Sequence, residues 1–280
     1  MSRYRRNRLG RVMPRLLTVL LALLLFGSGR ASADSDQALQ FLPGSDTRPA
    51  LWADGREPMS RVVARTGQTR IEAAIADGFV LLRYDAHAWA VQLGLASAGF
   101  LSFDPKGSLT FALMTFDGLV ALPITITHGD LAHTVEWAHV SAHYADGIRG
   151  VLGYGEIDTG TYSREYMRWT TALQAGPWTP YVGARALIHT IPLVAPWGFQ
   201  AGLQWDGGDK LPLFAAIDAR AAAEHDWQGR WRGQVGGRFT GPRERGIQLG
   251  LECARGPDEK GKWEGREDAY CGAFLALEPR

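Results

Sequence analysis

The sequence predicts an all-β protein, an antiparallel up-and-down transmembrane β-barrel of roughly 10–12 strands. Three observations indicate it. Segments of about ten residues alternate between apolar and small or polar side chains, with glycine, proline and aspartate between them. No stretch after residue 33 approaches the roughly 20 apolar residues of a membrane helix. The N-terminus carries the features of an export signal.

The export signal has the three parts of a secretory leader. Six arginines between residues 3 and 15 form a cationic region, and residues 16–26 form an apolar run too short for a spanning helix. Ala31-Ser32-Ala33 then supplies the small-x-small cleavage pattern. We therefore expect a cleaved signal peptide, with residue 34 as the first residue of the mature chain.

The remaining chain divides by composition. Residues 34–60 are rich in proline, aspartate and glycine, and the alternating segments follow them. We expect three parts: residues 1–33 as the signal peptide, 34–60 as an N-terminal periplasmic extension, and 61–280 as the β-barrel domain. The pattern also allows a short helix over residues 71–76.

The charge of the mature chain excludes a nucleic-acid partner. The leader holds seven of the 30 basic residues and none of the 29 acidic ones, so the remainder has a net charge of −6 and no basic stripe. The chain also lacks a glycine-rich phosphate loop, a dinucleotide fingerprint and zinc-finger spacing, so neither a cofactor nor a metal site is expected. The expected partners are membrane lipids or lipopolysaccharide, and the barrel-assembly machinery during insertion.

The alternation assigns a face to each strand residue. Apolar residues two apart recur in four clear segments, which contain Trp89, Val91, Leu93 and Leu95; Leu131, Val135 and Trp137; Ile247, Leu249, Leu251 and Cys253; and Cys271, Ala273, Leu275 and Leu277. In a membrane barrel this face meets lipid and the small or polar face lines the lumen. A soluble periplasmic barrel would turn the apolar face inward.

The two cysteines, Cys253 and Cys271, flank a charged, glycine-bearing stretch. A hairpin loop centred near Lys262 places them opposite each other on paired strands. Their Cβ atoms are then roughly 4.5–5.5 Å apart, which suits a disulfide in an exported protein. We predict a disulfide that joins the two strands.

One strand carries chemistry on its predicted lipid face. His139, Ser141 and His143 share that face with Trp137 and lie near the strand's end. Histidine can take the proton of a serine hydroxyl while an acid orients the imidazole, which is the chemistry of an acyl hydrolase. Glu165, on the following strand, is the candidate acid.

Other residues nearby offer alternatives. Asp146, Glu156 and Asp158 in the following loop are alternative acids, and backbone N–H groups near Gly147 or Gly150 are candidate oxyanion donors. The same histidines and serine, at a strand's end, can also sit among lipid headgroups without catalysis.

Two further motifs receive structural interpretations. Arg164 and Arg168 share a face with two tyrosines, and this face is expected to be the lumen, where the arginines line a narrow polar interior or pair with Glu136 across the barrel. His225-Asp226 marks a tight turn between strands.

Several motifs resemble the DUF1207 family of uncharacterised bacterial envelope proteins. They run in order from about residue 40 to the C-terminus: Phe41-Leu42-Pro43, Ala53-Asp54-Gly55-Arg56-Glu57-Pro58, His139-Val140-Ser141-Ala142-His143, Tyr162-Ser163-Arg164-Glu165-Tyr166 and Glu224-His225-Asp226-Trp227. The resemblance implies an outer-membrane β-barrel-like protein with no assigned reaction.

A narrower resemblance concerns one motif. His139-x-Ser141 is similar to the His-x-Ser pair of outer-membrane phospholipase A and of the lipid A 3-O-deacylase. Those enzymes carry Asn-Gly directly after the serine, whereas Ala142-His143 stands here. The resemblance implies a hydrolase site, and the departure removes one part of its motif.

Three functions follow from these patterns, and the sequence leaves open whether the chain is an enzyme. The first is an outer-membrane β-barrel protein of unassigned activity in the cell envelope. The second is an outer-membrane lipid acyl-hydrolase, of phospholipase or lipid A deacylase type, that uses Ser141 and His139. The third is a soluble periplasmic β-barrel binding protein, which would place the chain in the periplasm instead of the outer membrane.

Overall fold

The computed structural model describes residues 37–44, 46–66, 70–105, 111–150, 160–208, 211–240 and 246–278. The expected signal peptide lies outside these ranges. Within them, no helix has the length and apolar character needed to cross a membrane. The alternating segments form strands, as the sequence predicts.

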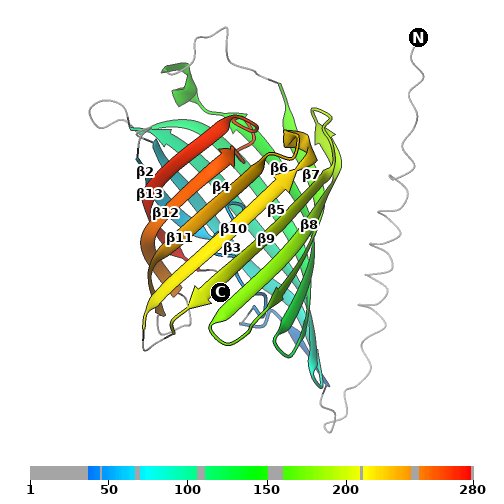
Figure 1. Ribbon diagram of the computed structural model, residues 1–280. Coiled ribbons are helices and arrows are strands. Elements are labelled where there is room, and N and C mark those ends of the chain that lie inside the picture. Colours follow the sequence, from blue (N-terminus) through cyan, green and yellow to red (C-terminus); the bar gives the residue numbers. More distant parts are fainter. Residues whose placement is uncertain are drawn as a thin grey trace, which may run out of the picture. The chain divides into compact units, whose positions relative to one another are not determined.

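Twelve of these strands, β2 to β13, form a closed antiparallel barrel (Figure 1). Each pairs with its neighbours in sequence, and β2 pairs with both β13 and β3, which closes the ring. Closure joins the first and last strands of the barrel, as a sheet in lipid requires. The strands are β2 (Ser60–Arg65), β3 (Arg70–Ala86), β4 (Trp89–Asp104), β5 (Ala112–His128), β6 (Leu131–Tyr144), β7 (Tyr162–Leu173), β8 (Trp178–Ile191), β9 (Trp197–Asp206), β10 (Leu213–Ala222), β11 (Gly229–Thr240), β12 (Gly246–Pro257) and β13 (Glu267–Leu277).

A further strand, β1 (Gln37–Phe41), pairs with residues 82–86 of β3. β2 pairs with the other end of β3, at residues 70–74. The short helix expected over residues 71–76 is wrong, because these residues belong to β3. Glu72 and Ala74 point inward, and Ile75 is exposed on the outer wall. Side chains that alternate between the two faces are typical of a strand. The pairing of β3 with β2 and β4 sets this alternation.

The predicted faces are confirmed. Val91, Leu249 and Leu251 are exposed on the outer wall, whereas their neighbours Gln92 and Glu252 are buried inside. An apolar outside around a polar inside is the arrangement of a membrane barrel and the reverse of a soluble one. Exposed tryptophans lie near both ends of the strands, as interfacial girdles do: Trp89 and Trp178 at one end, and Trp197, Trp227 and Trp231 at the other.

The predicted disulfide is confirmed. Cys253 on β12 and Cys271 on β13 are directly opposite in register and are bonded to each other. The bond lies on the outer wall, because its neighbours Glu252 and Gly272 face the lumen. It joins the two strands that lead into and out of the connection 258–266.

Residues 46–59, expected within an N-terminal periplasmic extension, lie inside the barrel. The backbone N–H of Trp52 donates to Gln204 Oε1 (2.6 Å), and the Trp52 ring packs edge-on against Phe214. Arg168 Nη1 lies 2.8 Å from Asp54 Oδ2, and Arg220 also pairs with Asp54. The segment therefore fills part of the lumen.

The connection 258–266 fills another part of the lumen. Asp117 Oδ2, on β5, accepts hydrogen bonds from the backbone of Gly261 (2.9 Å) and from Arg56 Nη2 (2.8 Å). A side chain at Gly261 would collide with Ala142 and Tyr162, so only glycine allows this close approach. One carboxylate on the wall thus binds both internal segments.

The two ends of the barrel differ. One end, here the turn end, carries the connections 87–88, 129–130 and 174–177. The other, the loop end, carries the connections 192–196, 223–228 and 258–266, together with the end of β6. Among these fully described connections, those at the loop end are the longer ones. The short 3-10 helices η2 (Asp146–Gly150) and η3 (Ala223–His225) are there as well.

Asp54→Asn is expected to destabilise the barrel. Asp54 is 1% exposed and pairs with Arg168 and Arg220, so its neutralisation leaves two buried guanidinium groups undercompensated. Loss of one partner from a buried pair costs about 3–5 kcal/mol. Urea unfolding in detergent, followed by the mobility of the unboiled protein on a gel, measures it.

The matched control is Glu267→Gln, which breaks the exposed pair with Arg255 on the outer wall, with side chains 77% and 68% exposed. Such a pair contributes about 0–1 kcal/mol. Equal losses in the two variants would contradict the structural role of the buried network.

Reduction of the disulfide is expected to lower stability by about 2–4 kcal/mol, because the bond limits the unfolded chain. Unfolding midpoints with and without reductant measure this, and Cys253→Ser/Cys271→Ser is the control that reductant leaves unchanged. A double variant as stable as the oxidised protein would refute it.

Candidate functional site

The motif on β6 lies where the sequence predicts. His139, Ser141 and His143 all face outward, and their neighbours Val140 and Ala142 are buried. We call His139, Ser141, His143 and Glu165 the outer-wall cluster. It lies toward the loop end of β6 and β7. The period of two, continued from Leu131, is sufficient to place it.

Glu165 joins the motif from β7. It is directly opposite His139 in register, and its Oε1 lies 3.5 Å from His139 Nδ1. Both side chains are partly exposed, at 31% and 39%. Antiparallel pairing of β6 with β7 therefore brings the predicted acid beside the predicted base.

The Ser141 side chain has free space beside it. Its partners across the ladders are Ser163 on β7 and Gly118 on β5. A Cβ at Gly118 would lie 3.7 Å from Ser141 Oγ, so the missing side chain leaves room beside the hydroxyl. In the described part of the chain, Ser141 makes no hydrogen bond to His139 or His143.

Of the remaining predicted site residues, His143 shares the outward face of β6 with Ser141, and the others lie beyond the strand. His143 is exposed and is paired in register with Phe116. Asp146 begins η2, and Gly147 packs against Ala112 and Leu113 at the start of β5. Gly150 ends η2, and the alternative acids Glu156 and Asp158 lie outside the described residues.

The sequence analysis missed a histidine beside Glu165. On β8, Glu165 is paired with His189 and Tyr166 with Leu187, so a bulge leaves Ile188 without a partner. Ile188 and His189 are consequently both exposed, although strict alternation after the buried Leu187 would turn His189 inward. Three outward residues, one on each of β6, β7 and β8, thus form a row of His139, Glu165 and His189.

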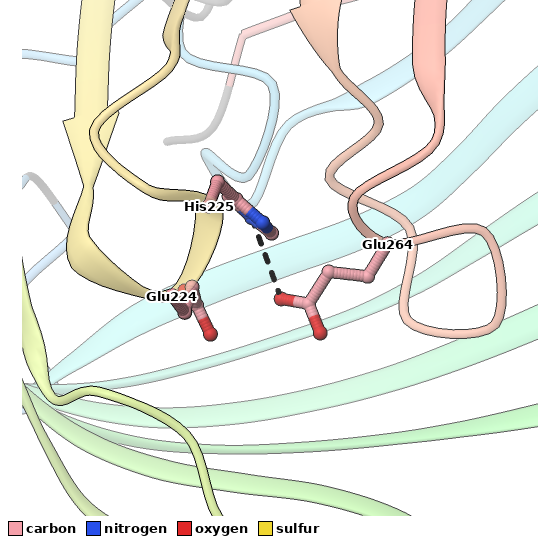
Figure 2. Close-up of side chains that lie close together, drawn as sticks. All are labelled: Glu224, His225 and Glu264. Carbon is pink, nitrogen blue, oxygen red and sulfur yellow. Dashed lines mark ion pairs between the residues drawn. The ribbon is translucent and has the colours of Figure 1, made fainter.

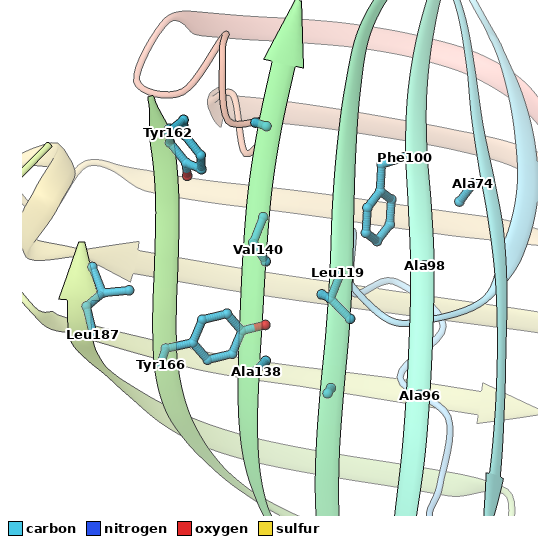
Figure 3. Close-up of a cluster of buried hydrophobic side chains, with 12 residues drawn as sticks. Ala74, Ala96, Ala98, Phe100, Leu119, Ala138, Val140, Tyr162, Tyr166 and Leu187 are labelled. Atoms are coloured by element: carbon cyan, nitrogen blue, oxygen red, sulfur yellow. The ribbon is translucent and has the colours of Figure 1, made fainter. Parts of the chain in front are cut away.

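The predicted lumen face of the β7 arginines is confirmed, and the pair with Glu136 forms between neighbouring strands and not across the barrel. Arg164 and Arg168 face the lumen, and Arg168 Nη2 lies 3.0 Å from Glu136 Oε1 on β6. The adjoining inner wall is apolar across β3 to β8, where alanines, Phe100, Val140 and Tyr166 pack together (Figure 3). Buried charge and apolar side chains therefore share the inner wall, as on β7, where Tyr166 lies between Arg164 and Arg168.

A second cluster lies inside the loop end. We call Glu224, His225 and Glu264 the mouth cluster (Figure 2). The predicted turn at His225-Asp226 is confirmed, because η3 is followed by Asp226 and Trp227 with positive φ between β10 and β11. His225 Nε2 points toward Glu264 Oε1, 3.9 Å away on the connection 258–266.

The ligand atoms of the mouth cluster lie within 4.8 Å of one another, which a metal ion would require. Guanidinium groups, however, already neutralise both carboxylates. Arg185 binds Glu224 Oε1, and Arg164 lies 2.8 Å from Glu264 Oε2 and 3.5 Å from Glu224 Oε2. A divalent cation would have to displace them, so the arrangement favours an ion-pair cluster over a metal centre.

Burial and crowding shift the proton affinities of the two loop residues. Burial, together with the nearby charge of Glu224, raises the pKa of Glu264 to about 7. Burial also lowers the pKa of His225. The cluster can therefore take up a proton near neutral pH, at Glu264.

The mouth cluster borders a cavity of about 100 Å³ inside the barrel. Arginines, two tyrosines and small apolar residues from β6 to β11 line it, and the connection 258–266 covers part of it. Sequence reasoning missed this cavity, because its lining residues come from strands far apart in the chain.

Comparison with solved structures shows the fold. Outer membrane phospholipase A from Escherichia coli matches with a TM-score of 0.55 and 10% identity, over 84% of this chain and 95% of that one. An active-site mutant of that protein gives the same TM-score and identity over 79% and 90%. The Salmonella typhi phospholipase, solved as a dimer with bound calcium, also has a TM-score of 0.55 and 10% identity, with 84% and 95% covered.

No family model matches the chain, so the resemblance to DUF1207 stays a prediction. No curated protein matches it either. The closed twelve-stranded barrel, its apolar outer wall and its structural neighbours define an outer-membrane-type β-barrel. Identities of 10% carry the fold alone and no activity.

Glu264→Gln is expected to flatten the dependence of stability on pH. The pKa of Glu264 is raised to about 7, so the fold favours the neutral form. Its contribution is fully present below the ordinary pKa and is lost as pH rises through about 7. Unfolding midpoints between pH 4.5 and 8 should fall less in the variant, by up to about 1.4 kcal/mol per pH unit. Identical pH profiles would contradict the raised pKa.

Proposed function

We propose that the protein is an acyl hydrolase of membrane lipids, with Ser141 as nucleophile, His139 as base and Glu165 as the residue that orients His139. The observation that carries the proposal is the 3.5 Å pair between His139 Nδ1 and Glu165 Oε1, in register, on the same outward face as Ser141. Charged and polar residues on a lipid-facing wall are costly and are commonly functional.

The reaction follows from these positions. His139 takes the Ser141 proton as Oγ bonds to the ester carbonyl carbon. The ester C–O bond then breaks, and the leaving alcohol takes the proton from the imidazole. Water attacks the acyl-serine with His139 again as base, and the fatty acid leaves. His139 and Ser141 are two residues apart on one strand, so their Cα atoms are roughly 7 Å apart. The His139 ring and the Ser141 hydroxyl must therefore turn toward each other when substrate binds.

The oxyanion is expected to form beside Ser163. Backbone N–H groups of central strands are used by the ladder, so a side-chain donor is needed there. Ser163 is directly opposite Ser141, and side chains paired in this way have Cβ atoms roughly 4.5–5.5 Å apart. The gap at Gly118, on the other side of Ser141, gives an acyl chain access from the lipid.

The orientation of the barrel in the outer membrane is proposed from the lengths of its connections. Outer-membrane barrels place short turns in the periplasm and longer loops outside the cell. The loop end would then face the exterior and place the outer-wall cluster in the outer leaflet. Export through a cleaved signal peptide of residues 1–33 belongs to this proposal.

Ser141→Ala is expected to abolish fatty-acid release from phospholipid in mixed micelles, because it removes the nucleophile. His139→Ala and Glu165→Gln should each lower kcat, the former on the order of 100-fold or more. The matched control is Ser97→Ala, an exposed outer-wall serine on β4, which should keep full activity. Gly118→Leu should raise KM by filling the gap beside Ser141.

A second candidate function is a barrel whose outer-wall cluster only contacts lipid headgroups. One observation favours it: Ser141 makes no hydrogen bond to either imidazole in the described chain. The same assay decides between the two. Fatty-acid release that is equal in the wild type and Ser141→Ala would remove the hydrolase and leave the lipid-contact function.

A further inference from the structure

The cavity behind the mouth cluster has an unusual lining, independent of the outer-wall chemistry. Six guanidinium groups border it, and they come from the internal segment and from β7, β8, β10 and β11: Arg56, Arg164, Arg168, Arg185, Arg220 and Arg230. Three glutamates border it as well, Glu224, Glu259 and Glu264. Each of these carboxylates pairs with at least one of the six arginines. The lining therefore has more positive than negative charge.

The arginines are fixed before any ligand arrives. Arg168 is held by Asp54 and Glu136, and Arg220 by Asp218, all of which stand behind the cavity wall. A guanidinium group held in this way loses little side-chain entropy when it binds an anion. Water-excluding walls also strengthen its attraction for negative charge.

Hydrogen-bond donors of the lining are left over. Arg168 Nε and Arg56 Nη1 are both buried and make no hydrogen bond, and the Arg168 side chain is only 9% exposed. Buried donors without a partner are costly, so a group that accepts from them is favoured. Carboxylate oxygen is the strong acceptor for guanidinium N–H.

Part of the remaining lining is apolar. Val140 and Ala222 are buried side chains on the inner wall, and the ring of Tyr166 lies beside them in the same lining, 5.8 Å from the Arg185 guanidinium carbon. Gly183 and Gly198 have no side chains to fill the space. This part of the lining can pack against a flat or short hydrocarbon group, whereas an inorganic ion would gain no favourable contact from it.

We propose that this cavity binds a small organic anion, with its carboxylate on the guanidinium N–H groups of the wall and its apolar body against Val140, Tyr166 and Ala222. The site is in the lumen, behind the mouth cluster, and does not involve the outer-wall cluster. Arg185 is the most accessible of its arginines, with a side chain 33% exposed.

Binding of the anion is linked to a proton at the cavity's edge. Glu264 faces Arg164 and Tyr162 on β7, Arg185 on β8, and Glu224 and His225 on the β10–β11 turn. A neutral Glu264 releases Arg164 for the ligand, and its pKa is about 7. Affinity for the anion therefore rises as pH falls from 8 to 6.

The test is calorimetric titration of the detergent-solubilised full-length barrel with benzoate at pH 6, and with benzyl alcohol and inorganic phosphate as separate arms. Benzoate is expected to bind at least 10-fold more tightly than either of the others. Benzyl alcohol that binds equally well would show partition into apolar surface, and phosphate that binds equally well would show a plain anion site. Either result, or no benzoate binding, overturns the proposal.

Two variants locate the site. Arg185→Gln should weaken benzoate binding at least 10-fold, whereas Arg255→Gln, which removes one positive charge from the outer wall, should leave it unchanged. Glu264→Gln should bind at pH 8 as the wild type does at pH 6. Unboiled gel mobility confirms that each variant is folded. Equal binding by Arg185→Gln and the wild type would overturn the assignment of the cavity.

Discussion

The interior ion-pair network is the interaction on which the rest of this structure depends. Asp54 on the internal segment pairs with Arg168 on β7 and Arg220 on β10, and Asp117 binds both Arg56 and the backbone of Gly261. These contacts hold residues 46–59 and 258–266 inside the barrel. A twelve-stranded barrel is wide enough to need such filling, because its wall side chains alone leave space. Buried pairs of this kind fix one arrangement, since any single loss leaves an uncompensated charge.

With the lumen filled, the barrel has a charged interior and a mostly apolar outer wall. The inside holds nearly all of the described buried charge, with a cavity left at the loop end. The outside is apolar except for a few residues, among them the row of His139, Glu165 and His189. The proposed chemistry on lipids belongs to the outer surface, and the proposed binding of a small organic anion belongs to the inner one. The two can be inactivated separately, because no residue belongs to both.

The sequence predicts what depends on local periodicity and neighbouring pairing. Leu249 and Leu251 reveal the outer face, and the spacing of Cys253 and Cys271 about a loop reveals the disulfide. Glu165 could be placed beside His139 because β7 follows β6 in an antiparallel meander. Contacts between distant residues could not be predicted: the pair of Asp54 with Arg168 has no periodic signal. The bulge that turns His189 outward also breaks the alternation on which face prediction depends.

The most direct measurement of this account is the conductance of the purified protein in a planar lipid bilayer. The account predicts no steady conductance steps, because residues 46–59 and 258–266 are fixed in the lumen by buried ion pairs. Asp54→Asn weakens the ion pairs that hold residues 46–59 in the lumen, and should then produce conductance where the wild type has none. Stable, ohmic steps from the wild-type protein would contradict the account, since they require both segments to leave the lumen and would make the barrel a channel.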